Sequence, residues 1–246
     1  MTDLLLFQLR RVGRNRQYLF FTVLLPALFT IFFTKIIGGQ VPAGDYQDVA
    51  GDTMVSMMAY GAIGAALGAT IRLAFDRASG WLRQLRVTPV PTGTVFAVDV
   101  LVGALLVLPG VVVVALVGRF VNGVQLPLGT WLALVGVLWV GAVVFVALGL
   151  AVGLALDEQA AGAAIGILGT VLAALGGLWF PVDMFPSGLA ALAHALPSYW
   201  YAELGRDVAA GTPALAPVLA LAGYGVLFSA AAVLVARRRP LHAVAG

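Results

Sequence analysis

Few side chains in this sequence could perform covalent or metal chemistry. The 246 residues include no cysteine and only two histidines, His194 and His242, which lie far apart in the chain. Without cysteine the chain cannot form disulfides, thiolate zinc sites or iron–sulfur clusters, and it has no thiol nucleophile. Two distant histidines argue against a histidine-rich metal site or a haem held by paired histidines. No serine-nucleophile motif accompanies His194, so we expect neither a catalytic residue nor a metal site in this chain.

The single lysine limits nucleotide chemistry. A P-loop has the pattern G-x-x-x-x-G-K-[ST], in which backbone N–H groups hold the phosphates and the lysine reaches them. Lys35 follows Phe-Phe-Thr, and no such pattern surrounds it. We therefore expect that this chain does not hydrolyse ATP itself.

The composition indicates that the surrounding medium is a lipid bilayer. Hydrophobic residues make up 61% of the chain, charged residues make up 10%, and the mean hydropathy is +1.02; a typical soluble domain has about 25% charged residues. A transmembrane helix needs ~20 mostly apolar residues. Six stretches meet this requirement, at 18–37, 53–71, 94–118, 130–156, 160–181 and 214–236. We expect an all-α polytopic membrane protein, with six spans in one transmembrane domain over residues 1–246.

The basic residues predict the orientation of these spans. Lysine and arginine accumulate in the cytoplasmic loops of membrane proteins. Of the fourteen basic residues, eleven fall before the first span, between the second and third, or after the sixth, and three fall on the opposite side. We therefore expect both termini in the cytoplasm and an even number of spans. The preference for arginine over lysine, together with many alanines, glycines and valines, suggests a bacterial genome, so the expected location is the inner (plasma) membrane of a bacterial cell.

Two segments outside the spans are predicted to lie at a membrane surface. Residues 181–213 form the longest non-spanning segment, and the apolar run Leu189–Leu196 within it is too short to span the bilayer. With Pro-Ser-Tyr-Trp-Tyr after it as an aromatic anchor, this run is interpreted as a short interfacial or re-entrant helix, and an ordinary surface loop is the alternative. The N-terminal segment mixes leucines with arginines, which is typical of an interfacial helix or of a positive flank to the first span.

The loop between the second and third spans carries the most functional information. Between Arg72 and Pro89, apolar residues such as Phe75 mix with charged residues such as Asp76. This pattern predicts an amphipathic helix beneath the membrane that ends before Pro89, because proline breaks a helix. Such a helix offers a docking surface for a partner; a positive loop that rests on lipid headgroups is the alternative.

Two groups of residues carry a family resemblance. The cytoplasmic loop reads Asp76-Arg77-x-x-Gly80-x-Leu82-x-x-Leu85-x-x-Thr88-Pro89, and the outer segment contains Gly176–Pro181, Met184–Pro186 and Leu196–Trp200. In their order and spacing, over essentially the whole chain, they resemble the ABC-2 type transporter permeases, the membrane subunits of bacterial ABC exporters. Trp81 stands where that family often has threonine, and Leu196 where it often has asparagine.

The resemblance implies transport driven by a partner. In this family the loop is a coupling helix that sits in a groove of a cytoplasmic ABC ATPase. Two ATPase subunits would bind ATP and Mg²⁺, and a second permease subunit would complete a homodimer or heterodimer. The role would be export of a hydrophobic or amphipathic compound (a drug, an antibiotic or a lipid), as in multidrug efflux or antibiotic resistance. The ATPase contact would comprise Asp76, Arg77, Gly80, Trp81, Leu82 and Arg83.

The resemblance also places the substrate pathway along the second and fifth spans. The apolar character of these spans favours a hydrophobic or amphipathic compound over a polysaccharide. The spacing of Gly162 and Gly166 permits close helix packing, either within the chain or in a dimer. The candidate pathway residues are Met54, Met57, Met58, Tyr60 and Trp179.

Three charged residues leave alternatives open. Asp99, in the third span, would pair with a loop arginine such as Arg86 or take part in a proton relay. Asp157 and Glu158 would cap the N-terminus of the fifth span or lie near the ATPase. An ion-coupled secondary exporter without an ATPase is the alternative function. It would need ionisable residues deep in several spans, and Asp99 is the one candidate.

Overall fold

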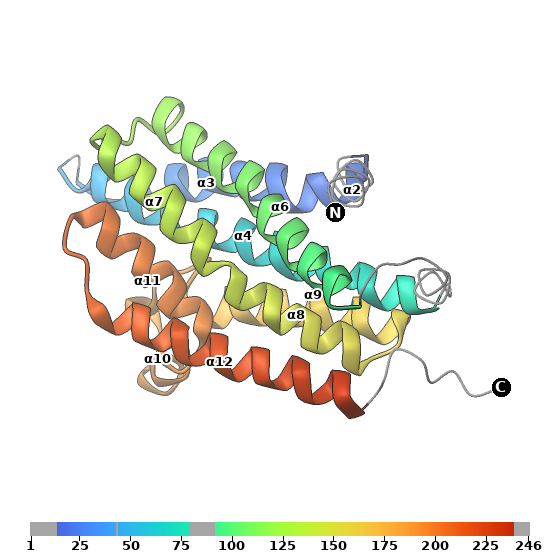
Figure 1. The fold of residues 1–246 in the computed structure, drawn as a ribbon. Coiled ribbons are helices and arrows are strands. Elements are labelled where there is room, and N and C mark those ends of the chain that lie inside the picture. The colour runs from blue at the N-terminus through green and yellow to red at the C-terminus, as the bar shows by residue number, and fades with distance from the viewer. Residues whose placement is uncertain (1–13, 43, 79–91, 239–246) are drawn as a thin grey trace.

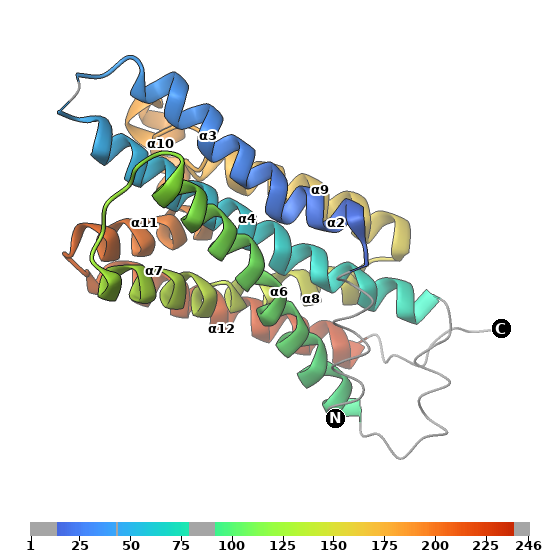
Figure 2. The same cartoon turned by 90° about the horizontal axis from the view of Figure 1, so that it is seen from above.

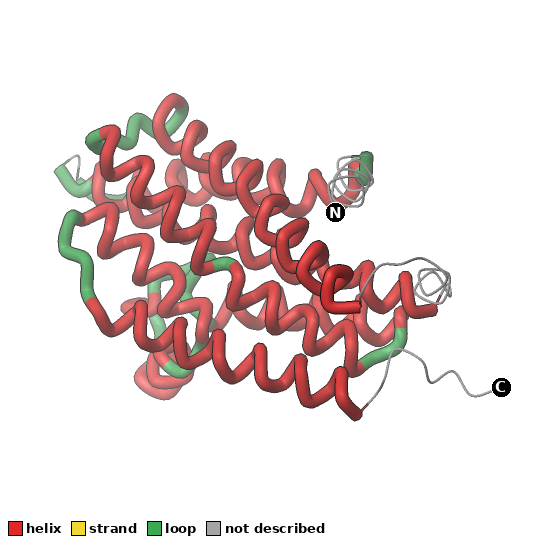
Figure 3. The backbone as a smooth tube through the Cα atoms, viewed as in Figure 1, coloured by secondary structure: helices red, strands yellow, loops and turns green. Residues whose placement is uncertain are grey.

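A computed structural model describes residues 14–42, 44–78 and 92–238, and over these residues the regular elements are helices (Figures 1 and 3). The prediction of an all-α fold is confirmed for this part of the chain. The first half consists of α2 (Arg16–Leu19), the π-helical turn η1 (Phe20–Leu24), α3 (Leu25–Gly38), α4 (Tyr46–Ala78) and α6 (Thr92–Phe120). The second half consists of α7 (Leu128–Gly141), α8 (Val143–Ala155), α9 (Glu158–Leu175), the 3₁₀ turn η2 (Val182–Met184), α10 (Ser187–His194), α11 (Pro197–Ala210) and α12 (Leu215–Arg238).

The long helices run side by side and alternate in direction (Figures 1 and 2). The beginning of α2, the end of α4, the beginning of α6 and the end of α12 lie at one end of the bundle, named here the α2/α12 end. The connections from α3 to α4, from α6 to α7 and from α11 to α12 lie at the opposite end, named the α10/α11 end. The two described ends of the chain therefore share one end of the bundle. That this end faces the cytoplasm stays a prediction.

Within the described ranges, five helical stretches are long and apolar enough to cross a membrane. They are Arg16–Gly38, Tyr46–Ile71, Val100–Phe120, Leu128–Ala155 and Leu215–Arg238. They correspond to the predicted spans 18–37, 53–71, 94–118, 130–156 and 214–236. The remaining predicted span, 160–181, corresponds to a shorter apolar helix, Gln159–Leu175. The structure thus supports five of the six spans, and a sixth span through α9 stays a prediction.

α9 ends earlier than the sequence pattern predicted. The N–H of Gly176 closes the helix by donating to the Leu172 carbonyl at 3.1 Å. Gly177 then has a φ of 75°, in the left-handed region that glycine adopts without strain. Two successive glycines thus turn the chain out of the helix, and the prediction that this helix continues to Pro181 is wrong.

α4 is longer than the predicted second span. It runs for 33 residues, and residues 72–78, the beginning of the predicted amphipathic helix, continue α4. The rest of that predicted helix, residues 79–88, lies outside the described residues. No glycine or proline lies between Ile71 and Ala78 to stop the helix. The N-terminal segment predicted as an interfacial helix, residues 1–13, lies outside the described residues.

α4 forms the centre of the bundle, and α12 lies at its edge. α4 contacts α3, α6, α8, α9 and α11, and its span is the most buried of the five. Small side chains such as Ala59, Ala62 and Ala66 have no exposed surface, and they allow neighbouring helices to approach closely. α12 packs mainly on α8 and α11 and leaves most of its apolar side chains exposed, as a lipid-facing helix does.

α3, α4 and α6 meet closely around Pro26. Proline has no N–H, so the Thr22 carbonyl one turn earlier lacks its usual helical donor, and the π-helical turn η1 lies at this place. A Cβ on Gly110 of α6 would lie 2.7 Å from the Thr22 oxygen. A Cβ on Gly61 of α4 would lie 3.1 Å from Pro26 Cγ. Glycine at these two positions brings the three helices together at what we name the Pro26 crossing.

Polar bonds hold the first transmembrane stretch on both sides of the Pro26 crossing. Toward the α2/α12 end, the Tyr18 hydroxyl donates to the Ala65 carbonyl of α4 at 2.9 Å. Toward the other end, the buried Asn122 donates through Nδ2 to the Thr30 carbonyl at 3.1 Å and to the Thr34 hydroxyl at 2.9 Å. Hydrogen bonds in apolar surroundings are strong because water does not compete, so these bonds fix the position of α3 against α4 and α6.

The outer segment predicted to lie at a membrane surface forms α10 and α11. α10 covers most of the apolar run Leu189–Leu196, and its interfacial position stays a prediction. α11, which was not predicted, packs into the bundle against α4, α7 and α12. Tyr201 is completely buried beside Gly141, and its hydroxyl donates to the Leu138 carbonyl of α7. The interpretation of Pro-Ser-Tyr-Trp-Tyr as an interfacial anchor is therefore wrong for Tyr201, which is a core residue.

Candidate substrate pocket

The predicted pathway residues of α4 divide between the core and the face toward α3 and α9. Met54 and Met58 have no exposed surface. The Met54 side chain occupies the space beside Gly118 of α6, where a Cβ would lie 2.2 Å from its sulfur. These two methionines therefore fill the core of the bundle. Met57 is also buried but lines a pocket as well, and Tyr60 is partly exposed.

Aromatic rings connect α3, α4 and the segment that follows α9. Tyr60 contacts Trp179 edge to face, with ring centroids 5.8 Å apart, and stacks on Phe29 at 6.3 Å. Phe33 contacts Phe29 at 5.5 Å and Phe180 at 5.9 Å. Aromatic pairs at such distances stabilise their arrangement beyond simple burial. We name these five rings the aromatic cluster; two of the predicted pathway residues belong to it.

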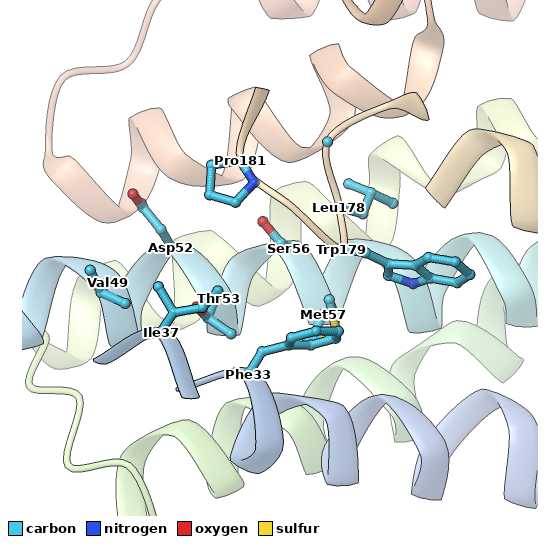
Figure 4. Close-up of a pocket in the computed structure, with 11 residues that line it drawn as sticks. Phe33, Ile37, Val49, Asp52, Thr53, Ser56, Met57, Leu178, Trp179 and Pro181 are labelled. Atoms are coloured by element: carbon cyan, nitrogen blue, oxygen red, sulfur yellow. The ribbon is translucent and has the colours of Figure 1, made fainter. Parts of the chain in front are cut away.

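A small pocket opens beside the aromatic cluster, between α3, α4 and the turn after α9 (Figure 4). Its volume is ≈ 90 Å³. We name it the Asp52 pocket. It is lined by Phe33, Ile37, Val49, Asp52, Thr53, Ser56, Met57, Gly177, Leu178, Trp179 and Pro181.

The turn after α9 places Trp179 over α4. A Cβ on Gly176 would lie 2.0 Å from Ser198 Oγ, so the chain passes tightly against α11 only because this residue is glycine. Ser198 in turn donates to the Leu172 carbonyl at 2.7 Å and ties α11 to the end of α9. The Trp179 indole N–H, which these contacts position, is buried and has no hydrogen-bond partner among the described residues.

α11 supplies charged groups at the edge of the Asp52 pocket. Arg206 donates to the Glu203 carboxylate at 2.8 and 3.0 Å and to Ser56 Oγ at 3.3 Å. Its guanidinium carbon also lies 5.9 Å from the ring centroid of Tyr199. Burial raises the pKa of the Tyr199 hydroxyl, and the nearby Glu203 raises it further. Glu203 thus balances the charge of Arg206, whereas Asp52 has no ion pair or hydrogen bond among the described residues.

Sequence reasoning found part of this site. It named Tyr60 but missed Asp52 and Ser56, which precede it by two turns and one turn on the same face of α4. It also missed Phe29 and Phe33, although their spacing of four residues places them together on one face of α3. Spacing by four residues was therefore the signal that could have extended the predicted pathway to the whole site.

The predicted ATPase contact is largely outside the described residues. For Asp76 and Arg77 the structure describes the helical backbone of α4 and not the side chains. The contact stays a prediction. The other residues of the predicted contact lie outside the described residues; they are Gly80, Trp81, Leu82 and Arg83.

Of the three other charged residues, one has a defined role. Asp157 accepts a hydrogen bond from the N–H of Ala160 at 2.8 Å and is the N-cap of α9, which confirms the capping interpretation for this residue. The side chains of Glu158 and Asp99 are not described, so both alternatives for Asp99 stay open.

The described residues form an apolar helical bundle with a pocket between its helices, and comparison with known proteins identifies the class. Residues 4–209 match the family model of the ABC-2 type transporter. The chain therefore belongs to the ABC-2 type transporter family, and it is a membrane transport permease, a component that is not itself catalytic. It is 27% identical over 225 residues to the protein named "Putative transport permease YvfS" of Bacillus subtilis (strain 168), and the match covers 90% of each chain.

Proposed function

We propose that this chain is the membrane subunit of an ATP-driven exporter and moves a hydrophobic or amphipathic compound out of the cytoplasm or the inner leaflet. A separate cytoplasmic ATPase, in two copies, binds ATP and Mg²⁺ and supplies the energy. Multidrug efflux and antibiotic resistance are roles of this kind. Membership of the ABC-2 type transporter family supports an ATPase partner.

One observation supports the proposal further: α4 extends from the Asp52 pocket to the proposed ATPase contact. α4 contains Asp52, Ser56 and Tyr60 in its first half and the backbone of Asp76 and Arg77 near its end. Its 33 residues correspond to ~50 Å at 1.5 Å per residue. No proline interrupts it. Because a continuous helix moves as a rigid element, a displacement by the ATPase at the α2/α12 end would tilt the Asp52 pocket and the aromatic cluster.

A second permease subunit, a copy of this chain or a related one, completes the pathway in this proposal. The open face of α9 supports such an interface. A Cβ on Gly162, Gly166 or Gly169 would meet no atom within 4 Å, and small residues permit close helix approach in membranes. Large apolar side chains such as Ile167 and Phe180 are exposed on the same part of the molecule.

The test is purification of the tagged permease from its native membrane, followed by assays for a bound ATPase and for ATP-dependent transport in vesicles. The variant Leu82→Glu is expected to abolish ATPase association and transport while membrane insertion is retained, because a charge replaces an apolar residue of the proposed contact. Gln84→Glu adds a similar charge in the same segment, outside the proposed contact residues, and is the matched control.

Two results would overturn this function. Transport that continues after ATP depletion and requires an ion gradient would favour the ion-coupled secondary exporter instead. Full transport by the Leu82→Glu variant would show that the ATPase contact is misplaced.

A further inference from the structure

The Asp52 pocket combines a carboxylate with aromatic walls. The exposed Asp52 lines it from α4 and has no ion pair or hydrogen bond among the described residues. Phe33 lines it from α3, and Trp179 from the turn after α9 (Figure 4). A carboxylate and the faces of aromatic rings both attract cations. The thioether of Met57, also in the wall, is polarisable and adapts to different ligands.

The charges around this pocket are mainly negative. The carboxylates of Asp48, Asp183 and Glu203 act electrostatically on Asp52, and the guanidinium of Arg206 acts in the opposite sense. Arg206 is held in an ion pair with Glu203 at 2.8 Å. Four carboxylates against one guanidinium leave an excess of negative charge, and a cleft with such an excess concentrates cations.

The size of the pocket limits what it can hold. A volume of ≈ 90 Å³ accommodates one ammonium or guanidinium group, and it is too small for a whole drug-sized molecule, whose sites are about 300–1,000 Å³. The aromatic cluster continues from the pocket through Phe33 to Phe180 and through Trp179 to Tyr60. Phe180 is 49% exposed, so an apolar body attached to the cationic group has an aromatic surface to lie on.

We propose that the Asp52 pocket binds the cationic head group of an amphiphile and that the exported compound is therefore a cationic amphiphile, such as a long-chain amine or guanidine. Asp52 supplies the counter-charge, Phe33 and Trp179 supply cation–π contacts, and the rest of the aromatic cluster holds the apolar body. The assignment of the bound compound as the exported one rests on the proposed function; binding of the cation does not depend on an ATPase.

The test measures equilibrium binding of radiolabelled n-dodecylamine, which is charged at neutral pH, to the purified full chain in phosphatidylcholine nanodiscs. n-Dodecanol has the same chain length without the charge, and empty nanodiscs correct for partitioning into lipid. We expect saturable binding of the amine and a loss of about tenfold in its affinity in Asp52→Asn, since a charge-assisted contact is removed. Binding of the alcohol is expected to be unchanged in the same variant.

Two further variants control for folding and for general surface charge. Asp52→Glu keeps the carboxylate and is expected to remain within about threefold of the wild-type affinity, because only the reach of the charge changes. Asp45→Asn removes an exposed carboxylate that does not line the pocket and is expected to have little effect. Size-exclusion profiles and thermal midpoints show whether each variant is folded.

Equal affinity of the wild type for the amine and the alcohol, or absence of saturable amine binding, would overturn the proposal. An equal loss in Asp45→Asn and Asp52→Asn would also overturn it, since the effect would then belong to the general surface charge. These outcomes are separate from a failure of the proposed function, which would appear as a permease that binds the amine with Asp52 dependence but neither associates with an ATPase nor transports with ATP.

Discussion

At the scale of single residues, glycine and proline decide how closely the helices of this permease approach. Pro26 leaves the Thr22 carbonyl without its usual helical donor, and membrane helices tolerate such a break where neighbouring groups or a local π-helical turn such as η1 satisfy the freed group. Gly110 and Gly61 bring α6 and α4 against this place. At Gly110 a Cβ would lie so close to the Thr22 carbonyl oxygen that the backbone would have to move, and at Gly61 it would be a tight contact. At the Pro26 crossing, the proline of α3 therefore depends on the glycines of α4 and α6 that pack against it.

This dependence predicts that Gly110→Ala destabilises the protein. The added methyl would lie 2.7 Å from the Thr22 oxygen, and a backbone atom cannot rotate away as a flexible side chain can. We expect a loss of about 1–3 kcal/mol, typical of overpacking, seen as a lower thermal midpoint of the purified protein in detergent. The control is Gly136→Ala in α7, where a Cβ meets nothing within 4 Å and alanine should be neutral or stabilising by up to about 1 kcal/mol. Equal midpoints for the two variants would contradict the close packing at the crossing.

At the scale of elements, a few polar contacts hold helices that have little buried surface. The span that contains α3 is only 28% buried, against 78% for that of α4, so packing alone fixes α3 weakly. The bonds from Asn122 to Thr30 and Thr34 compensate by joining α3 to the end of α6. α3 also carries two rings of the aromatic cluster, so its position bears on the shape of the Asp52 pocket.

We therefore predict that Asn122→Ala loosens α3. The substitution removes both hydrogen bonds and leaves the buried Thr34 hydroxyl without this donor, at an expected cost of about 1–3 kcal/mol. The readouts are the thermal midpoint and faster amide hydrogen exchange in α3. Gln47→Ala is the matched control, because Gln47 makes a single exposed hydrogen bond of 3.3 Å to the Gly123 carbonyl and should contribute less than about 0.5 kcal/mol. If hydrogen exchange in α3 is the same in both variants, the bonds of Asn122 do not hold the helix.

At the scale of the whole molecule, the features that could be predicted from the sequence are the membrane spans, because the apolar bilayer requires an apolar segment of a certain length. A span must be apolar over its full length, so the predicted spans 18–37 and 214–236 agree with Arg16–Gly38 and Leu215–Arg238 to within two residues at each end. Apolar character does not give the end of α9 in this way, because the helix ends at Gly176 and Gly177 while the apolar run continues beyond them. The close approach of Gly176 to Ser198, a residue of another helix, could not be predicted from the sequence.

The candidate site was predicted only in part, because it also depends on contacts between helices. Apolar character alone did not separate Met54, which fills the core, from Met57, which lines the Asp52 pocket. That distinction depends on which helices surround α4 on each side. Asp52 falls just before the predicted span 53–71 and was not a candidate, whereas α4 begins at Tyr46 and carries Asp52 on its pocket-lining face.

The arrangement of the whole bundle predicts that α9 crosses the membrane as a sixth span, although its apolar part is short. α9 begins near the end of α8 and runs antiparallel to it toward the α10/α11 end (Figures 1 and 2). Its 18 residues extend for ~27 Å at 1.5 Å per residue, close to the ~30 Å of the hydrocarbon core.

Because the chain has no native cysteine, single introduced cysteines can report on each end of α9 without background labelling. Asp183→Cys, exposed beyond α9, is expected to react with a membrane-impermeant maleimide in intact cells, whereas Gln159→Cys, exposed at its beginning, should react only after permeabilisation. Ala243→Cys in the C-terminal tail should behave like Gln159→Cys if both lie in the cytoplasm. Labelling of the cysteines at 159 and 183 from the same side would show that α9 does not span the membrane and that the protein has five spans, with its termini on opposite sides.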